Sequence, residues 1–214
     1  MIKIYHLIIF YSKDIYISKL YETDIKDAYL GACHEQAMVQ VDVYGTYCEK
    51  VVGVSRHNFF NAGVMLINCH QFREKKVLKK FLNYLWEYNF VVTQDEDYLN
   101  LICKDQVHWL SQKWNTELTA GLEYNYDVTT AYILHYIMVN KPWHYHNCRG
   151  ASIYWDYAKN TSVYEDLKNE LYAYTDAERE RDALSAQQLA QMAIDETERE
   201  DNFLNVWGDK LPLV

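Results

Sequence analysis

The sequence predicts an α/β fold in which helices cover the faces of a mixed sheet. Residues 59–68 form a continuous apolar run, which is typical of a central strand buried on both faces. A helix-period pattern follows over residues 73–85, and strand and helix patterns then alternate as far as residue 137. Such alternation places helices against a parallel or mixed sheet.

The first part of the chain contains one strand candidate before this run, at residues 27–33, while residues 35–57 carry mixed signals. In the helix after the run, the apolar residues fall on one face, and they are Val77, Leu78, Phe81, Leu82 and Leu85. The basic residues of this segment predict a solvated face, and they are Arg73, Lys75, Lys76, Lys79 and Lys80.

A second helix is expected to start near Gln94, because Thr93 and Glu96 have the spacing of a capping box. Short strands are predicted at residues 107–110 and 131–137. Beyond residue 150 the composition shifts, with one helix expected around residues 163–171 and a long, acidic, solvent-facing helix over residues 176–200. We therefore expect a main domain over residues 1–160 and a helical, acidic tail over residues 161–214.

Composition restricts the classes of function. The chain has 214 residues and a net charge of −9, which argues against nucleic acid or an anionic membrane as the main partner. Its five cysteines contain no CxxC pair, so we expect reduced thiols and a cytoplasmic protein. No apolar run reaches transmembrane length. The 20 tyrosines and 6 tryptophans suit core packing and also suit stacking on sugar rings.

The first segment with chemical content is residues 60–64, inside the predicted central strand. Gly63 weakens a strand and often marks the close approach of a backbone or a ligand. Asn61 can both donate and accept hydrogen bonds, as sugar hydroxyls require. The alternative is a β-bulge with a satisfied asparagine, and the residues alone favour neither interpretation.

The second segment is residues 94–100. Asp95 and Glu96 at a helix start are expected from capping and the helix dipole alone. The functional alternative is that their carboxylates face a cleft, where they would hold sugar hydroxyls or stabilise an oxocarbenium-like transition state. Asp95 and Asp97 also match the pattern D-x-D. We assign no metal to them, because of where this segment lies relative to the other two segments.

The third segment is His135, at the end of an apolar strand, with Lys141 six residues later. An imidazole can ligate Mn²⁺, and a lysine can neutralise charge on a departing phosphate. A lone histidine in this position is otherwise a core or rim residue.

Three motifs, in their order and spacing, closely resemble those of the family 8 glycosyltransferases. They are F-N-A-G-V-M-L-I-N, Q-D-E-D-Y-L-N, and a strand that ends in H-Y and is followed by K-P-W. The resemblance covers about residues 17–160. It implies a GT-A fold, Mn²⁺ as cofactor, and transfer of a hexose from a UDP-sugar to a glycan acceptor, such as lipopolysaccharide, with retention of configuration.

The resemblance also implies residue roles. Asn61, Ala62 and Gly63 would contact the donor sugar and its diphosphate. Asp95 would bind the sugar hydroxyls, and Glu96 would lie near the anomeric carbon, where the family often has Gln. His135 would be a protein ligand of Mn²⁺, and Lys141 would reach the diphosphate. Met138 stands where the family frequently has Gly.

The family's nucleotide-binding front half has no counterpart in this sequence. The family carries a D-x-D motif there, its metal–diphosphate signature. In an alignment without gaps, the two acidic positions of this motif fall on Ile8 and Phe10. An alignment with a gap retains only one acidic residue, Asp14. Three explanations stay open: a truncated remnant, a non-catalytic carbohydrate-binding or interaction module, and a second chain that supplies the missing half. In each case we expect an open sheet edge that an oligomer contact or a partner chain would cover.

Overall fold

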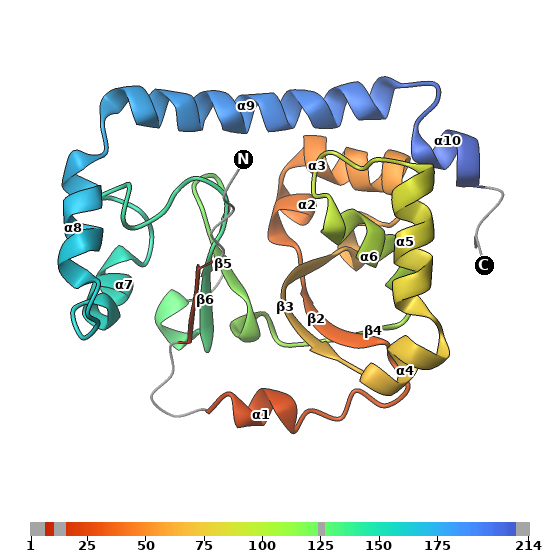
Figure 1. The fold of residues 1–214 in the computed structure, drawn as a ribbon, viewed down its shortest axis with the longest axis horizontal. Coiled ribbons are helices and arrows are strands. Elements are labelled where there is room, and N and C mark those ends of the chain that lie inside the picture. Colours follow the sequence, from red (N-terminus) through yellow and green to blue (C-terminus); the bar gives the residue numbers. More distant parts are fainter. Residues whose placement is uncertain (1–6, 11–15, 124–126, 209–214) are drawn as a thin grey trace.

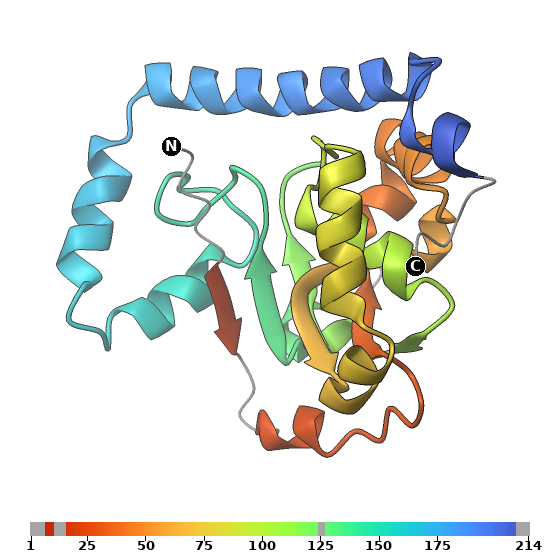
Figure 2. The same cartoon turned by 45° about the vertical axis from the view of Figure 1, so that its right-hand side comes forward.

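The fold is a mixed α/β arrangement, seen in a computed structural model that describes residues 7–10, 16–123 and 127–208 (Figure 1). This confirms the predicted fold class. The strands form two three-stranded sheets, ordered β3-β2-β4 and β1-β6-β5. Helices surround both sheets, and α9 runs along one side of the molecule from α8 to α10 (Figures 1 and 2).

Each sheet is mixed. In one sheet, β2 pairs antiparallel with β3 and parallel with β4. In the other sheet, β6 pairs antiparallel with β1 and parallel with β5. The strands are β1 Leu7–Phe10, β2 Leu30–His34, β3 Phe60–Ile67, β4 Val107–Trp109, β5 Thr116–Leu118 and β6 Ile133–Tyr136.

The helices lie mainly before β3, after β3 and at the C-terminal end. The α-helices are α1 Ser18–Tyr21, α2 Gln36–Gln40, α3 Asp42–Tyr47, α4 Cys69–Glu74, α5 Val77–Glu87, α6 Asp95–Cys103, α7 Ala151–Ala158, α8 Tyr164–Ala173, α9 Asp176–Glu198 and α10 Phe203–Trp207. A π-helical turn, Cys48–Val52, and three short 3-10 turns, Arg56–Asn58, Gln112–Trp114 and Val128–Thr130, complete the described elements.

The predicted central strand is confirmed as β3, and the predicted strand at residues 27–33 begins later, at Leu30. The segment with mixed signals, residues 35–57, forms α2, α3 and the π-helical turn. Its short helices are stabilised by packing, since Met38, Tyr47 and Val51 are buried in the largest core cluster. Tertiary burial, and not local propensity, therefore determines the structure of this segment.

The main core lies between α3, α5, α6 and the C-terminal end of α9. Its centre is a group of aromatic rings in edge-on or tilted contact, with ring centroids 4.9–5.8 Å apart among Tyr84, Phe90, Tyr98 and Phe203. Such geometry is the preferred one for aromatic pairs. A second cluster joins β5 and β6 to α7 through Tyr136 and Tyr154.

The apolar face of α5 is wider than the part that the core covers, which corrects the sequence-based interpretation of this helix. Val77 is 1% exposed, whereas Leu78 is 69% exposed, and Leu82 and Leu85 are each 50% exposed. Of the predicted face, Val77 and Phe81 contact the core, and Tyr84 beside them is buried. An apolar helix face thus predicts the helix correctly but overestimates its burial.

The difference between the two neighbouring α5 residues predicts different effects of substitution. We expect Val77→Ala to lower the free energy of unfolding by about 2 kcal/mol, because it leaves a cavity in the core. Leu78→Ala should change it by less than about 0.5 kcal/mol, because little contact is lost. Denaturant unfolding of both variants measures this, and equal losses would contradict the burial pattern.

The long C-terminal helix is confirmed as α9, Asp176–Glu198, and its start is the capping box between Thr175 and Glu178. Most of α9 is exposed as predicted, but its C-terminal end is not. Ala193 is buried, and the buried Glu196 accepts a hydrogen bond from the Tyr88 hydroxyl. This end of α9 is therefore part of the main core.

Three further expectations concern the chain as a whole. The cysteines at 33, 48, 69, 103 and 148 are all free thiols, as predicted. Within the described residues, no helix is long and apolar enough to cross a membrane. Asp14, the acidic residue of the gapped alignment, lies outside the described residues.

Candidate active site

The candidate site is centred on a bulge in β3. The ladder between β2 and β3 pairs Ala32 with Met65 and His34 with Phe60, so residues 61–64 lie opposite the single residue Cys33. Bulges of this kind redirect side chains and are frequent beside active sites. The motif F-N-A-G-V is therefore the place where β3 leaves regular pairing.

The imidazole of His135 lies so close to Gly63 that this position of the bulge has no room for a Cβ atom. A Cβ atom on Gly63 would lie 2.3 Å from Cε1 of His135 and 2.8 Å from Oδ1 of Asn61. The two interpretations of Gly63, a bulge and a close approach, are thus both present, and the approaching group is a side chain of β6.

A chain of hydrogen bonds runs through the buried side chains beside this bulge. Nδ1 of His135 lies 3.0 Å from Oδ1 of Asn115, and Nδ2 of Asn115 donates to Oδ1 of Asn61 at 2.7 Å. Nδ2 of Asn61 in turn donates to the Glu35 carboxylate. Amides donate hydrogen bonds through nitrogen and accept them through oxygen. The direction of the hydrogen bonds from His135 to Glu35 is therefore consistent with a proton on Nδ1 of His135.

This relay, formed by His135, Asn115, Asn61 and Glu35, connects the two sheets. Glu35 follows β2 and Asn61 belongs to β3, whereas Asn115 precedes β5 and His135 belongs to β6. All four residues are buried, with at most 5% exposure. Buried polar groups stabilise a fold only when their partners are in place, so the relay fixes one arrangement of the sheets.

A second buried carboxyl group, that of Glu117, lies next to the relay. Its Oε2 accepts a hydrogen bond from the backbone N–H of Gln36 at 3.0 Å, and its Oε1 has no hydrogen-bond partner among the described residues. Burial and the charge of Glu35 raise the pKa of Glu117 well above its usual range. The neutral form of Glu117 is therefore favoured in the folded chain.

The raised pKa of Glu117 gives stability an unusual pH dependence. The neutral form is favoured in the folded state, so its stabilising effect is complete below the unfolded-state pKa and is lost as the pH rises through the folded-state pKa. Between those two values the free energy of unfolding should fall by about 1.4 kcal/mol per pH unit for this group.

Glu117→Gln removes this titration while retaining the size of the side chain. We expect its stability relative to the unsubstituted chain to increase steadily from pH 5 upward, measured by urea unfolding at several pH values. Glu180→Gln, at an exposed position of α9, is the matched control and should leave the pH profile unchanged. Parallel profiles for Glu117→Gln and the unsubstituted chain would contradict the assignment.

Glu96 joins α6 to the bulge, and the predicted capping box is wrong. The residue before α6 is Gln94, with no side-chain cap, and the Thr93 hydroxyl has no hydrogen-bond partner within the described chain. The Glu96 carboxylate instead accepts a hydrogen bond from the backbone N–H of Ala62 at 2.7 Å. Burial, with a smaller effect of the Glu35 charge, raises the pKa of Glu96 well above its usual range.

Asn100, one turn further along α6, fixes this helix against the start of β3. Its Oδ1 accepts from the backbone N–H of Phe60 at 2.8 Å, and its Nδ2 donates to the carbonyl oxygens of Phe60 and Glu96 at 2.9 and 3.0 Å. The position of Glu96 at the bulge is therefore determined by buried hydrogen bonds on both sides.

The other two acidic residues of this segment make no hydrogen bond to the bulge within the described residues. Asp95 is exposed and lines a hollow of about 460 Å³ between α5, α6 and α9, together with Phe81 and Met192. Asp97 is buried and accepts hydrogen bonds from the Tyr47 hydroxyl and the Thr93 N–H, each at 3.0 Å. Asp97 is therefore a structural residue of the core, and no metal is assigned to the D-x-D pattern of Asp95 and Asp97.

Lys141 is half-buried in the loop after β6. Its ammonium group donates to the carbonyl oxygen of Tyr136, and burial lowers its pKa to about 8. The structure therefore brings Asn61, Ala62, Gly63, Glu96 and His135 together, while the ammonium group of Lys141 bonds to Tyr136, the residue after His135.

The described residues do not form a site for Mn²⁺. No group of three His, Cys, Asp or Glu side chains within residues 7–10, 16–123 and 127–208 is arranged to hold a metal ion. The residue opposite His135 on β1 is Ile8. A hard divalent cation requires several oxygen ligands, so we derive no step of the chemistry through a metal.

Four site residues were not identified from the sequence, and they are Glu35, Asn100, Asn115 and Glu117. Asn100 interrupts an apolar stretch at the end of the motif Q-D-E-D-Y-L-N, whereas Glu35 and Glu117 have no such signal. Partners 54 and 81 residues apart, as in Asn115–Asn61 and Glu117–Gln36, cannot be paired from one sequence.

Solved structures of similar fold indicate the class of protein. The chain has the fold of GT-A glycosyltransferases: the bifunctional glycosyltransferase WbbM aligns over 75% of this chain and 33% of WbbM with a TM-score of 0.66 at 16% identity. The galactosyltransferase LgtC, solved with donor and acceptor sugar analogs, aligns over 73% of this chain and 60% of LgtC with a TM-score of 0.56 at 26% identity.

The family is shown by the sequence itself. The profile of glycosyl transferase family 8 matches residues 7–147, and the chain belongs to this family. A putative glycosyltransferase of Haemophilus influenzae is 34% identical over 100 residues, covering 46% of this chain and 29% of that protein. The lipopolysaccharide 1,3-galactosyltransferase of Salmonella typhimurium is 30% identical over 113 residues, covering 49% and 33%. The chain thus spans about a third of the length of these two relatives.

Proposed function

We propose that this chain acts in the transfer of a hexose from a UDP-sugar to a glycan acceptor with retention of configuration. Its membership of glycosyl transferase family 8 supports the reaction class. The observation that carries the proposal is the Glu96–Ala62 hydrogen bond, which places a carboxylate at the β3 bulge, directly beside Asn61 and Gly63. Relatives named lipopolysaccharide galactosyl- and glucosyltransferases support a lipopolysaccharide or similar acceptor.

The proposed roles follow the placement of each residue. Asn61, Ala62 and Gly63 form the surface against which the donor sugar lies, with the relay fixing Asn61 from behind. Glu96 lies near the anomeric carbon, where an oxygen of its side chain stabilises developing positive charge. Asp95 is solvent-exposed and would hold the sugar hydroxyls.

Two proposed roles require a change from the observed contacts. Lys141 would have to leave the Tyr136 carbonyl to reach a diphosphate. His135 would contribute a nitrogen ligand to Mn²⁺, with the remaining oxygen ligands coming from outside the described residues. The free thiols are consistent with the proposed location in the cytoplasm.

The alternative function is carbohydrate binding without chemistry. One observation favours it: Ile8 lies opposite His135, at one of the two positions where the resemblance places the acidic residues of the family's D-x-D. A chain of this kind would bind the sugar through the bulge but would not release UDP from a sugar nucleotide.

Release of UDP from UDP-glucose and UDP-galactose, in the presence of Mn²⁺ and monitored by a coupled assay, separates the two functions. The transfer proposal requires release, and the binding alternative requires its absence. Glu96→Gln keeps an oxygen acceptor for the Ala62 N–H and should retain turnover. Glu96→Ala should lower turnover by about 100-fold, the typical effect of removing one electrostatic contact from a transition state. Equal rates for the Ala and Gln variants would remove Glu96 from the reaction.

A further inference from the structure

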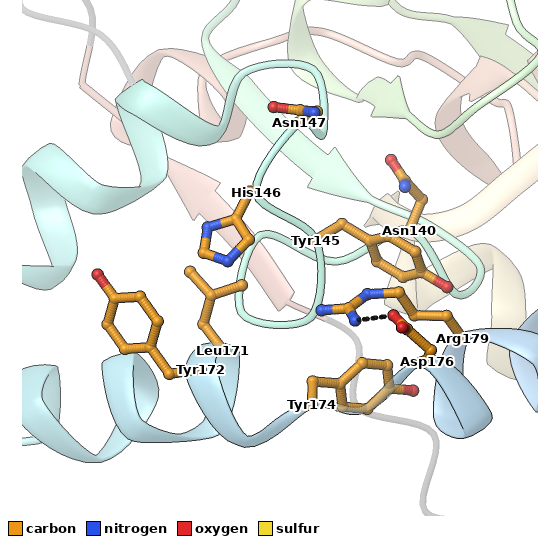
Figure 3. Close-up of a pocket in the computed structure, with 9 residues that line it drawn as sticks. All are labelled: Asn140, Tyr145, His146, Asn147, Leu171, Tyr172, Tyr174, Asp176 and Arg179. Atoms are coloured by element: carbon orange, nitrogen blue, oxygen red, sulfur yellow. Dashed lines mark hydrogen bonds and ion pairs between the residues drawn. The ribbon is translucent and has the colours of Figure 1, made fainter.

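A pocket lies between the loop after β6, the end of α8 and the start of α9 (Figure 3). Its volume is about 520 Å³, within the range of about 300–1,000 Å³ that small ligands occupy. The lining residues are Asn140, Tyr145, His146, Asn147, Leu171, Tyr172, Tyr174, Asp176 and Arg179. Five of these, from Leu171 onward, lie beyond the segment that matches the family.

The walls of this pocket are fixed by contacts between the loop and the two helices. The hydroxyl groups of Tyr145 and Tyr174 both donate to Oδ2 of Asp182, at 2.9 and 2.8 Å. The His144 ring stacks on Tyr174 with centroids 3.8 Å apart, and its Nε2 lies 3.0 Å from Oε1 of Glu170. A pocket held in this way loses little conformational entropy when a ligand binds.

One side of the pocket is aromatic. Tyr172 is 71% exposed, and its ring lies 5.8 Å from that of His146 at a tilted angle. Figure 3 shows these two rings together on one side, with Leu171 beside them. An exposed aromatic ring offers its face to the C–H groups of a sugar ring, which are apolar on one side.

The opposite side is polar, and its charges are balanced. Figure 3 shows Asn140, Asp176 and Arg179 on this side. The Arg179 guanidinium donates to Oδ1 of Asp176 at 3.0 Å and to the carbonyl oxygen of His144 at 3.3 Å. Its cation is therefore paired with a carboxylate, and Asp182 lies close by, so the pocket does not favour an anion such as phosphate.

We propose that this pocket binds neutral hexose units of a glycan, with one sugar ring stacked on Tyr172 and its hydroxyl groups bonded to the polar side. Amide and carboxylate groups provide both donors and acceptors, which sugar hydroxyls need. The inference does not rest on the proposed transfer reaction, because the pocket lies apart from the β3 bulge. The loop after β6 lines this pocket and also carries Lys141, a residue of the proposed donor site. A glycan bound in the pocket would therefore lie beside that loop.

Saturation-transfer NMR with lactose and maltotriose as neutral probes tests this site. Tyr172→Ala should weaken saccharide binding about tenfold, the effect of losing one stacked ring. Tyr21→Ala is the matched control, since Tyr21 is 84% exposed on α1, outside the pocket. Thermal melting confirms that the variants are folded. Asn140→Ala, on the polar side of the pocket, should weaken binding severalfold.

Three results would overturn the proposal: no saccharide signal from a folded chain, equal binding by the Tyr172→Ala and Tyr21→Ala variants, or displacement of the saccharide by inorganic phosphate. Added UDP should leave the saccharide signal unchanged. Saccharide binding that depends on Tyr172 in a chain that releases no UDP would support the pocket and contradict the transfer function. The two proposals therefore fail separately.

Discussion

Gly63→Ala is expected to destabilise the protein by about 3 kcal/mol, at the upper end of what overpacking a core costs. The added Cβ would lie 2.3 Å from Cε1 of His135, well inside contact distance. The ring cannot move away easily, because it is buried and bonded to Asn115. For a chain of this size the loss corresponds to a fall in Tm of about 6–12 °C.

A double-mutant cycle assigns this effect to the contact itself. His135→Ala removes the ring, so the cost of Gly63→Ala should be much smaller in that background. Gly208→Ala is the matched glycine control, because among the described residues its Cβ would meet only the side chain of Leu204, at 3.1 Å. Additive losses for Gly63→Ala and His135→Ala would show that the strain arises elsewhere.

Asn100→Ala is the second substitution with a large expected effect, a loss of about 3 kcal/mol. It leaves the N–H and the carbonyl oxygen of Phe60 without their partners in a buried environment, and each such group costs about 1–3 kcal/mol. Since Asn100 also holds the carbonyl oxygen of Glu96, any UDP release by the chain should fall together with stability.

Chemical unfolding of Asn100→Ala beside Asn205→Ala provides the comparison. The Asn205 side chain donates to the Arg199 carbonyl oxygen on the surface, where water can replace it, so its loss should stay below about 0.5 kcal/mol. Similar losses for the two asparagines would contradict the role of Asn100 in joining α6 to β3.

The elements with strong periodicity could be predicted from the sequence. The apolar run became β3, and the Gly- and Pro-free acidic segment became α9. Residues 35–57 could not be predicted, because the short helices there depend on burial of Met38, Tyr47 and Val51 against distant parts of the chain. The exposed leucines of α5 show the reverse error, since periodicity predicts an apolar face without showing what covers it.

The candidate site could be predicted only where its residues form a contiguous motif. Asn61, Ala62 and Gly63 were identified together, and the structure places His135 against Gly63. Glu35 and Glu117 were missed because their significance arises from one another, across 82 residues of chain and two sheets. Glu96 was identified with the wrong local partner, since its carboxylate bonds to Ala62 and not to the helix start.

The measurement that tests the proposed donor site most directly is calorimetric titration of the chain with UDP-glucose and UDP-galactose in the presence of Mn²⁺. Asp95→Ala and Asp166→Ala form a matched pair, because both residues are exposed acids in the first turn of a helix. We expect one of the sugar nucleotides to bind, and Asp166→Ala to bind it equally well. Asp95→Ala should bind it about tenfold more weakly, as expected for one lost charged hydrogen bond. A folded chain that binds neither, or equal affinities for the two variants, would contradict the proposed donor site.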